Sequence, residues 1–279
     1  MIEDFLTFIM IRIVTIDLDG TLFDNVKNIS QQNIEAIKKC KELGVKIVIA
    51  TGRPISGVMP VLKRLGLTTN EDYCIIYNGS KVLNVGTNEE IFSTTISGKT
   101  VKELYNESIR LNTYFHAFRK NEELITTEHN QYTDVEATIN GINDVLVNIN
   151  DIKDDDEFLK AMLVCDNESL NNAEVNVNNI YKEKLSMVRS AKIFLEFLNK
   201  DSDKGKALLH LAKYLNVDIK DTMAIGDAGN DISMIKKAGV GVAMKNSFKE
   251  VLDICDFVTL SNEESGVSYA LHKFIIDKD

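Results

Sequence analysis

The sequence predicts an α/β fold in which a parallel β-sheet domain is interrupted by an inserted α+β domain. Short β-branched runs alternate with amphipathic helical patterns near both ends of the chain, as in sheets covered by helices on both faces. Between them this alternation stops, and strands mix with helices in no regular order. We expect the parallel-sheet domain to comprise residues 10–82 and 191–279, and the inserted domain residues 83–190.

Composition limits the class of protein. The 279 residues are 44% apolar and 27% charged, with two prolines, which is typical of a globular chain without long disordered linkers. The net charge of −10 argues against nucleic-acid binding, because phosphate contacts need clustered Lys and Arg. The four cysteines form no CxxC pair, so neither a zinc ribbon nor a redox motif is predicted, and a reducing cytoplasm is the expected location.

The first nine residues are apolar but do not form an export signal. Glu3 and Asp4 stand where a signal peptide carries lysine, and no small-residue cleavage site follows. The run is also too short to span a bilayer. Residues 1–9 are either an extension outside the fold or the product of an upstream start.

The first domain is predicted to begin with a regular alternation of strands and helices. In chain order we expect a strand over 11–16, a helix over 31–43 capped by Ser30, a strand over 45–50, a helix that Pro54 begins, and a strand over 73–77. Asn78 and Gly79 then predict a turn into antiparallel strands.

The inserted domain has a weaker pattern. We expect a helix from Ser97 to Leu111 and strands over 113–118, 160–165 and 185–189. The acidic stretch 151–157 and the asparagine-rich stretch 167–179 are interpreted as solvated loops or helix edges. Residues 193–198 are expected to lead back to the first domain.

The parallel-sheet pattern then returns. A helix is expected to follow Lys204, and strands are expected over 222–225, 240–243 and 257–259, with helices near 248–254 and 265–274.

Polar clusters follow three of these strands. They are Asp17 and Asp19, then Thr51-Gly52-Arg53, then Asp227, Asn230 and Asp231, and Lys204 opens a helix. Because parallel strands place their carboxyl ends at one edge of a sheet, these groups are expected to converge. Asp17 and Asp19 alone could form a solvated turn, since Asp and Gly are ordinary turn residues. Matching partners at the other strand ends favour a site.

The residue types indicate phosphoryl transfer. Several carboxylates facing one point suit a hard cation, and Mg²⁺ fits oxygen ligands better than zinc does. The Thr51 hydroxyl, the Gly52 amide and the Lys204 ammonium supply donors for an anion. Asp17 is predicted to attack phosphorus, and Asp19 to protonate the leaving oxygen and then activate water.

Four ordered motifs resemble those of the haloacid dehalogenase superfamily. They are Asp17-Leu18-Asp19-Gly20-Thr21, Thr51-Gly52-Arg53, Asp203-Lys204-Gly205, and Gly226 to Asp231. The stretches 241–246 and 264–267 further resemble its Cof-type phosphatase branch. The chain departs from that branch at Lys245-Asn246-Ser247 and Glu264-Ser265-Gly266, neither of which belongs to the predicted chemistry.

The resemblance implies a Rossmann-like core with a C2B-type cap. It implies Asp17 as nucleophile and Asp19 as general acid and base. It implies a Mg²⁺ site made of the Asp17 carboxylate, the Asp19 main-chain carbonyl and Asp227, with Asp231 supporting bound waters. Phosphate would be bound by Thr51, Gly52, Lys204 and Asn230, and the substrate residues where core meets cap would be Arg53 and Asn78.

We therefore predict a Mg²⁺-dependent phosphatase of small phosphorylated metabolites, with sugar phosphates first and nucleotide or cofactor phosphates second. Neither nucleic acid nor a membrane is an expected partner, and the chain is expected to be a monomer or homodimer. A phosphosugar mutase is the nearest alternative. A phospho-receiver module would be shorter and uncapped, and a non-catalytic binding protein would not need the complete set of motif residues.

Overall fold

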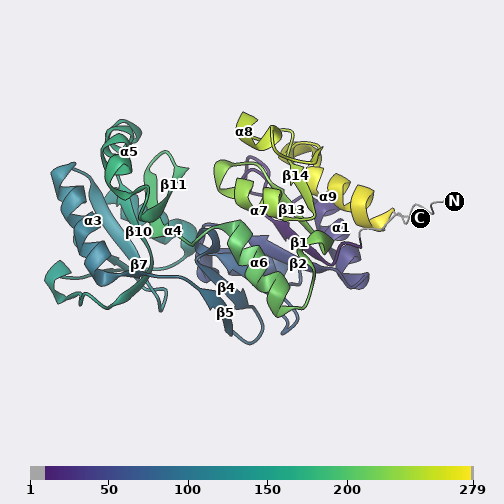
Figure 1. Ribbon diagram of the computed structural model, residues 1–279, viewed down its shortest axis with the longest axis horizontal. Helices are drawn as coiled ribbons and strands as arrows, with labels where there is room; N and C mark the ends of the chain where they lie inside the picture. The colour runs from purple at the N-terminus through teal and green to yellow at the C-terminus, as the bar shows by residue number, and fades with distance from the viewer. Residues whose placement is uncertain (1–9, 278–279) are drawn as a thin grey trace.

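The computed structural model describes residues 10–277, which form two β-sheets in two adjoining bodies (Figure 1). The predicted N-terminal extension, residues 1–9, lies outside the described residues. Among residues 10–277, every helix is too short or too polar to cross a membrane.

The larger sheet, here called the core sheet, has eight strands in the order β15-β14-β13-β1-β2-β3-β4-β5. Its strands are β1 (Ile13–Ile16), β2 (Lys46–Ala50), β3 (Tyr73–Ile76), β4 (Lys81–Asn84), β5 (Glu90–Ser93), β13 (Thr222–Gly226), β14 (Val240–Ala243) and β15 (Phe257–Val258). The pairs from β15 to β3 are parallel. After the Asn78-Gly79 turn, β4 and β5 are antiparallel, as predicted.

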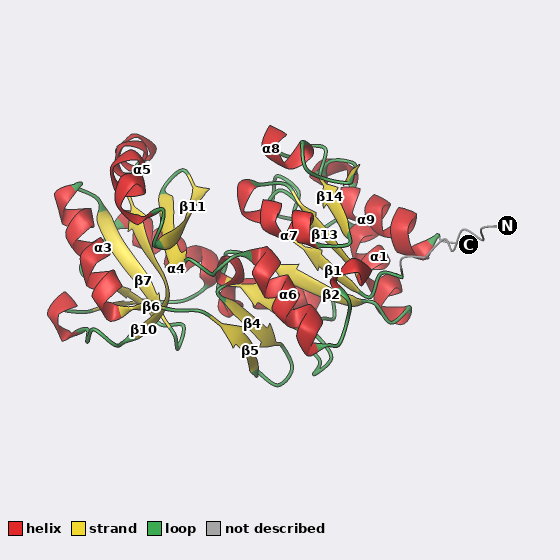
Figure 2. Cartoon of the chain, in the orientation of Figure 1, coloured by secondary structure: helices red, strands yellow, loops and turns green. Residues whose placement is uncertain are grey.

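Helices cover both faces of the core sheet (Figure 2). Side chains along a strand alternate between faces, so Val14 and Ile16 belong to one apolar cluster and Ile13 to another. The first cluster contains residues of α1 (Gln31–Glu42), α2 (Ile55–Arg64) and α9 (Gly266–Leu271), and the second contains residues of α6 (Lys204–Tyr214), α7 (Ile232–Lys237) and α8 (Lys249–Leu252). The predicted α/β fold with a parallel sheet is confirmed.

The second sheet, here called the cap sheet, has the order β11-β12-β10-β7-β8-β9, with β6 paired to β10. Its strands are β6 (Ile96–Ser97), β7 (Tyr114–Arg119), β8 (Leu124–Thr126), β9 (Asp144–Leu146), β10 (Glu157–Val164), β11 (Leu185–Ala191) and β12 (Phe194–Asn199). Helices α3 (Gly98–Arg110) and α5 (Asn167–Tyr181) pack on one face. Helix α4 (Gln131–Asn140) contacts α2 of the core.

The strand order places the two connections between the bodies at different residues from those predicted. Strands β4 and β5 belong to the core sheet, and β12, which was expected to lead back to the core, is an inner strand of the cap sheet. We therefore propose crossings near residues 94–95 and 200–203 in place of the predicted boundaries 82/83 and 190/191. A charged residue within the apolar run of β12 does not by itself reveal to which sheet the strand belongs.

Two predicted helix starts have the expected hydrogen bonds. Ser30 accepts from the Asn33 amide and Ser97 from the Thr100 amide. The asparagine-rich stretch is helical, because Asp166 caps α5 and Leu170, Ala173 and Val177 give it a buried face. Its asparagines lie mainly on the other side, so the helix-edge interpretation of that stretch is confirmed and the loop interpretation is wrong.

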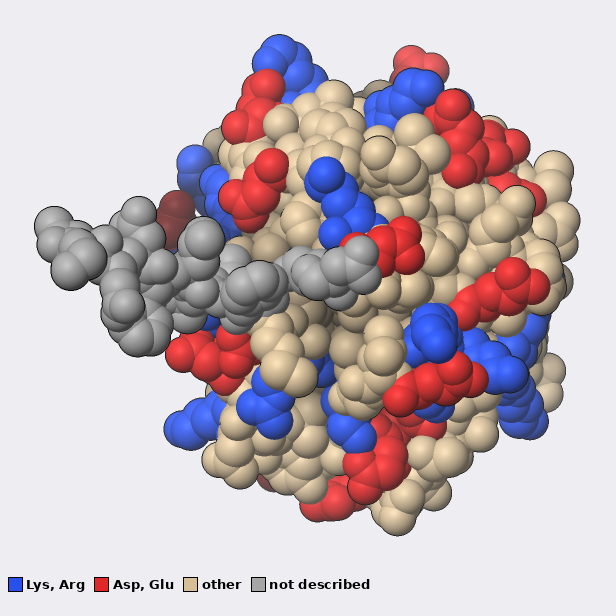
Figure 3. Space-filling model, turned by 90° about the vertical axis from the view of Figure 1, so that its right-hand side faces the viewer, with Lys and Arg blue, Asp and Glu red and all other residues tan. Residues whose placement is uncertain are grey.

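The end of the core that is remote from the cap carries both signs of charge. Acidic and basic side chains are interspersed on the face shown in Figure 3, without a field of one sign over the described residues seen there.

Candidate active site

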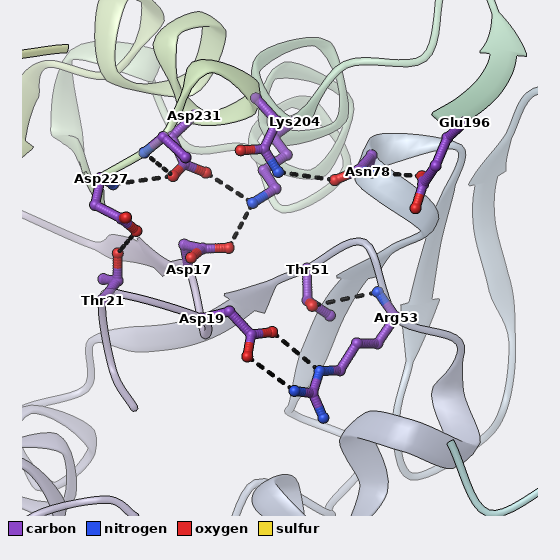
Figure 4. A network of polar contacts seen from close by, with 12 residues as sticks. Asp17, Asp19, Thr21, Thr51, Arg53, Asn78, Glu196, Lys204, Asp227 and Asp231 are labelled. Carbon is purple, nitrogen blue, oxygen red and sulfur yellow. Dashed lines mark hydrogen bonds and ion pairs between the residues drawn. The ribbon is translucent and has the colours of Figure 1, made fainter. Parts of the chain in front are cut away.

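The polar clusters predicted from the sequence meet at one edge of the core sheet. In the register of the parallel strands Ile16 lies opposite both Ile49 and Ile225, so β1, β2 and β13 end together. Asp17, Thr51 and Asp227 therefore follow neighbouring strand ends. Figure 4 shows them grouped around Lys204, which comes from the start of α6.

Lys204 joins two buried carboxylates. Its Nζ donates to Asp17 Oδ1 at 2.6 Å and to Asp231 Oδ1 at 2.7 Å. The lysine is fully buried. Burial alone lowers a lysine pKa, but the charges of Asp17 and Asp231 outweigh it here, so the pKa of Lys204 is raised and the side chain stays cationic.

Asp227 completes the acidic cluster. Its Oδ1 accepts from Thr21 Oγ1 at 2.7 Å, and its amide donates to Asp231 Oδ2 at 3.0 Å. Gly20 has φ +88°, and a Cβ there would lie 2.4 Å from Asp227 Oδ2. The glycine of the first motif is therefore needed both for its backbone conformation and for the close approach of Asp227.

The cluster has more acid than base. Burial, followed by the charge of Asp231, raises the pKa of Asp17 well above its usual value. Burial also raises the pKa of Asp227 to about 6, against the hydrogen bond from Thr21. Three carboxylates and one lysine leave a surplus of negative charge in a site that water barely reaches.

This surplus fits a divalent cation. One carboxylate oxygen from each of Asp17, Asp227 and Asp231 lies within 4.8 Å of the others, and all three residues are buried. Asp231 has less freedom than the other two, because its oxygens already accept from Lys204 and from the amides of Asp227 and Ala228. Oxygen-only ligands of this kind suit Mg²⁺.

Asp19 lies apart from this cluster and faces two basic residues. Arg53 donates to both of its oxygens, Nε at 3.1 Å and Nη2 at 2.9 Å, and Lys27 Nζ contacts Oδ1 at 2.5 Å. Burial raises the pKa of Asp19, but the hydrogen bonds and charges of Arg53 and Lys27 outweigh it, so the pKa is lowered. In this arrangement Asp19 is an ionised carboxylate.

The remaining predicted residues border the same edge. Thr51 is buried, and its Oγ1 accepts from the Arg53 amide at 3.3 Å. Asn230 Nδ2 donates to Asn78 Oδ1 at 3.0 Å. Eight of the ten predicted site residues line one space, and the other two, Lys204 and Asp231, are joined to it through the hydrogen bond from Lys204 to Asp17. Asp19 and Arg53 are turned toward each other (Figure 4).

The site opens into a cleft of about 1310 Å³ between core and cap. Its lining from the core includes Asp17, Asp19, Thr51 and Asp227, and its lining from the cap includes Glu136, Lys160 and Glu196. These three cap residues are themselves buried and form a second charge cluster.

Sequence reasoning missed Thr21, Glu136, Lys160 and Glu196. Thr21 is part of the first motif but was given no role of its own. A charged residue inside an otherwise apolar strand, as at Lys160 in β10 and Glu196 in β12, was the available signal. For Glu136 we find no such signal in the sequence of α4.

Known proteins resemble the chain over nearly its whole length. Residues 14–271 match the family described as haloacid dehalogenase-like hydrolase. The chain is 36% identical over 271 residues to "Putative phosphatase YxeH" of Bacillus subtilis, which covers 96% of this chain and 100% of that protein. It is 30% identical over 295 residues to the 5-amino-6-(5-phospho-D-ribitylamino)uracil phosphatase YwtE of the same organism, covering 95% and 98%. A crystal structure of a haloacid dehalogenase-like hydrolase from Bacteroides thetaiotaomicron matches with a TM-score of 0.84 at 29% identity, covering 95% of this chain and 100% of that one.

Proposed function

The chain belongs to the haloacid dehalogenase-like hydrolases and is a phosphomonoesterase, and from this premise we propose that Asp17 takes up the phosphoryl group of a small phosphorylated metabolite before water releases it. One observation carries the proposal. The buried Asp17 carboxylate lies at a strand end with Lys204 on Oδ1 and two further carboxylates beside it. Since Lys204 engages Oδ1, we assign the attack on phosphorus to Oδ2.

The reaction divides into two steps. In the first, Asp17 forms a bond to phosphorus as the ester P–O bond breaks, and the leaving oxygen takes a proton from Asp19. In the second, Asp19 removes a proton from water, which attacks the same phosphorus, so that inorganic phosphate leaves and the Asp17 carboxylate is restored.

Mg²⁺ is the cation that we propose for this site. The Asp17 carboxylate, the Asp19 main-chain carbonyl and Asp227 would hold it, and Asp231, whose oxygens are already occupied by hydrogen bonds, would support its waters. When bound, it would offset the negative charge of the phosphoryl oxygens.

Asp19 must change partners to act as an acid. Its pair with Arg53 and Lys27 keeps it ionised in this structure. A substrate phosphate entering the cleft offers both basic side chains an alternative anion, which would release Asp19 to carry a proton. Arg53 thus lies where a substrate can exchange with Asp19, which supports its assignment as a substrate residue.

The remaining donors would hold the transferred phosphate. We assign this role to the Thr51 hydroxyl, the Gly52 amide and Asn230, which line the cleft together with Asp17, and to Lys204, whose Nζ donates to Asp17 Oδ1. Backbone and side-chain donors fixed by buried elements need little reorganisation when charge develops on the phosphoryl oxygens.

Sugar or sugar-alcohol phosphates are the leading substrate class. The cap contributes polar side chains to the cleft, among them Glu136, Lys160, Arg189 and Ser190, and such groups suit hydroxyl-bearing leaving groups. The name of the relative YwtE specifies a phosphorylated ribityl chain. Nucleotide or cofactor phosphates are the second class, and a cytoplasmic location and a monomeric or dimeric state stay predictions.

The covalent step can be tested directly. Purified protein with Mg²⁺ is expected to release phosphate from a panel of sugar phosphates, and chelation is expected to abolish the release and lower the melting temperature. Asp17→Asn should reduce kcat by at least about 10³-fold and should prevent labelling of the acid-quenched protein by ³²P substrate. Asp24→Asn, a carboxylate in the following loop, is the matched control. Near-normal kcat in Asp17→Asn would exclude the covalent mechanism.

Asp19 has a separate test that depends on the leaving group. Asp19→Asn should slow turnover about 10²- to 10⁴-fold. An aryl phosphate needs no acid for its first step, so this variant should still release one equivalent of phenol per enzyme in a burst and then stall as the aspartyl phosphate. Absence of a burst, with an equal loss for aryl and alkyl esters in single turnovers, would contradict the two assigned roles.

A further inference from the structure

The turn between β3 and β4 has a strained backbone. Tyr77, Asn78 and Gly79 have φ values of +51°, +53° and +96° in succession. For a tyrosine this region is unfavourable, and such conformations persist only where surrounding contacts impose them. The Tyr77 amide donates to the Arg53 carbonyl at 3.2 Å and the Asn78 amide to the Thr51 carbonyl at 2.9 Å. The strained turn is thus attached to the segment that carries Thr51.

The same turn contacts every segment assigned to phosphate binding. A Cβ at Gly52 would lie 2.9 Å from Asn78 Nδ2, so the Asn78 amide packs directly on that glycine. A Cβ at Gly79 would lie 2.4 Å from the Asp203 backbone and 2.8 Å from the Lys204 nitrogen. Asn230 Nδ2 donates to Asn78 Oδ1. Asn78 itself is only 2% exposed.

A cap residue fixes which end of the Asn78 amide faces which neighbour. Asn78 Nδ2 donates to Glu196 Oε2 at 2.8 Å, and Glu196, whose other oxygen accepts from Lys160, is the acceptor of this bond. The Asn78 oxygen must therefore point the other way, to the Asn230 amide. Lys160 at 3.1 Å and Ser190 at 2.7 Å donate to the second Glu196 oxygen, Oε1, and hold that carboxylate in place.

We infer that Asn78 is a positioning residue of the phosphate site and that Glu196 of the cap strand β12 sets its orientation. Through Asn78, the cap contributes to holding Asn230, Gly52 and the start of α6 in the arrangement that receives phosphate. The inference rests on the proposed function, because Asn230 and Lys204 as phosphate ligands are themselves proposed. It gives Asn78 a role different from direct contact with the substrate's leaving group.

This role predicts an effect common to all substrates. A residue that contacts one leaving group changes KM for some esters and leaves inorganic phosphate unaffected. A residue that positions the phosphate donors changes the inhibition constant of inorganic phosphate and the KM of every ester by similar factors.

The first variant removes the amide and keeps the turn. Glycine adopts positive φ without strain, so Asn78→Gly should fold with a melting temperature near that of the wild type. It is expected to raise the dissociation constant of inorganic phosphate, measured by calorimetry in Mg²⁺, by about tenfold, in line with the loss of a buried hydrogen bond. The KM values of an aryl phosphate and a sugar phosphate should rise by similar factors, with a smaller change in kcat.

The second test exchanges donor and acceptor. Asn78→Asp places two carboxylates against each other and should weaken phosphate binding at least as much as Asn78→Gly. Combining it with Glu196→Gln turns the hydrogen bond around, because the introduced glutamine amide can donate to the new carboxylate, whose other oxygen still accepts from Asn230. The double variant should bind phosphate several-fold more tightly than Asn78→Asp. Glu157→Gln removes an exposed cap carboxylate of β10 that pairs with Lys120. It should change neither the dissociation constant of inorganic phosphate nor the KM of either ester.

These experiments distinguish a failure of the inference about Asn78 from a failure of the proposed function. Two results would overturn the inference and leave the proposed function intact. One is a double variant that binds inorganic phosphate no more tightly than Asn78→Asp. The other is an Asn78→Gly variant in which the dissociation constant of inorganic phosphate is unchanged and KM is altered for one ester only. If the wild type releases no phosphate from any ester in Mg²⁺, the proposed function fails first, and that result is obtained before any variant is made.

Discussion

Two buried lysines, one in the core and one in the cap, each lie between two carboxylates, but the charge balance around them differs. Lys204 lies between Asp17 and Asp231 at 2.6 and 2.7 Å, and Lys160 lies between Glu196 and Glu136 at 3.1 and 3.4 Å. Both side chains are buried; Lys160 lines the cleft, and Lys204 contacts Asp17, which lines it too. In each case the attraction to two carboxylates outweighs the cost of burial and raises the lysine pKa.

The difference lies in what surrounds each pair of acids. The core cluster has a third carboxylate, Asp227, whose pKa is raised to about 6, so it still has a surplus of negative charge that a cation can offset. In the cap cluster, the Glu196 carboxylate accepts hydrogen bonds from Lys160 and, among the described residues, from two neutral donors, Asn78 and Ser190. The same ion-pair geometry therefore suits cation binding where three carboxylates share one lysine, and positioning where two carboxylates share one lysine and neutral donors complete the hydrogen bonds.

The largest expected effect comes from the core lysine. Lys204→Met would leave three buried carboxylates without a counter-charge and should lower the free energy of unfolding by about 3–5 kcal/mol in the absence of metal. Because a divalent cation offsets the same surplus, millimolar Mg²⁺ should recover part of that loss in chemical denaturation. Turnover should fall at least about 10²-fold.

The control for this variant lies on the same helix. Lys206→Met removes a partly exposed lysine that pairs with Asp201 at the surface, and it should change stability by less than about 0.5 kcal/mol. Equal losses in the two variants, or no recovery by Mg²⁺ in Lys204→Met, would contradict the assignment of the core cluster as a cation site.

A smaller loss is expected from the cap lysine. In Lys160→Met one glutamate can take up a proton and donate to the other, and burial already raises the pKa of Glu136. We expect a loss of about 1–3 kcal/mol that Mg²⁺ does not recover. Recovery by Mg²⁺ equal to that of Lys204→Met would show that the two clusters do not differ in their need for a cation.

The sequence predicted the core cluster and not the cap cluster for a physical reason. Asp17, Thr51 and Asp227 follow short apolar strands that are local in sequence, and parallel pairing then brings the strand ends together whatever lies between them. Glu136, Lys160 and Glu196 come from a helix and two strands of a domain with weak periodicity. These side chains come together because of the strand order of the cap sheet and a register shift between Phe158 and Lys160. Neither feature can be predicted from a local sequence pattern.

The sheet to which β4 and β5 belong could not be predicted for a related reason. The antiparallel turn at Asn78-Gly79 was predicted correctly, but a hairpin can extend the first sheet or begin a new one, and here β4 and β5 extend it. The side-chain partners of Asp19 and Asn78 could not be predicted either, because only the folded chain shows that Asp19 faces Arg53 and that Asn78 faces Glu196.

The last expected effect concerns a neighbour of the cap lysine and separates the two bodies by their response to acid. His116 in β7 is buried, with Nδ1 3.0 Å from Thr133 Oγ1, and burial together with the charge of Lys160 lowers its pKa from 6.5 to about 3. In the unfolded chain the same histidine takes up a proton below pH 6.5, so its contribution to stability is complete above that pH. The contribution is lost as pH falls toward 3, by up to about 1.4 kcal/mol per pH unit.

Replacing His116 with a neutral residue of similar polarity isolates this contribution. His116→Gln should be somewhat less stable than the wild type at about pH 7, and the difference should shrink at about pH 4.5, because only the wild type carries the protonation penalty there. Urea unfolding at the two pH values, followed by a probe in the cap, measures the change. His210→Gln is the matched control, since His210 lies on α6 of the core, stacked on Phe92. A difference between wild type and His116→Gln that stays constant between the two pH values would mean that the cap does not hold this histidine neutral, and the acid sensitivity would then have to arise in the core.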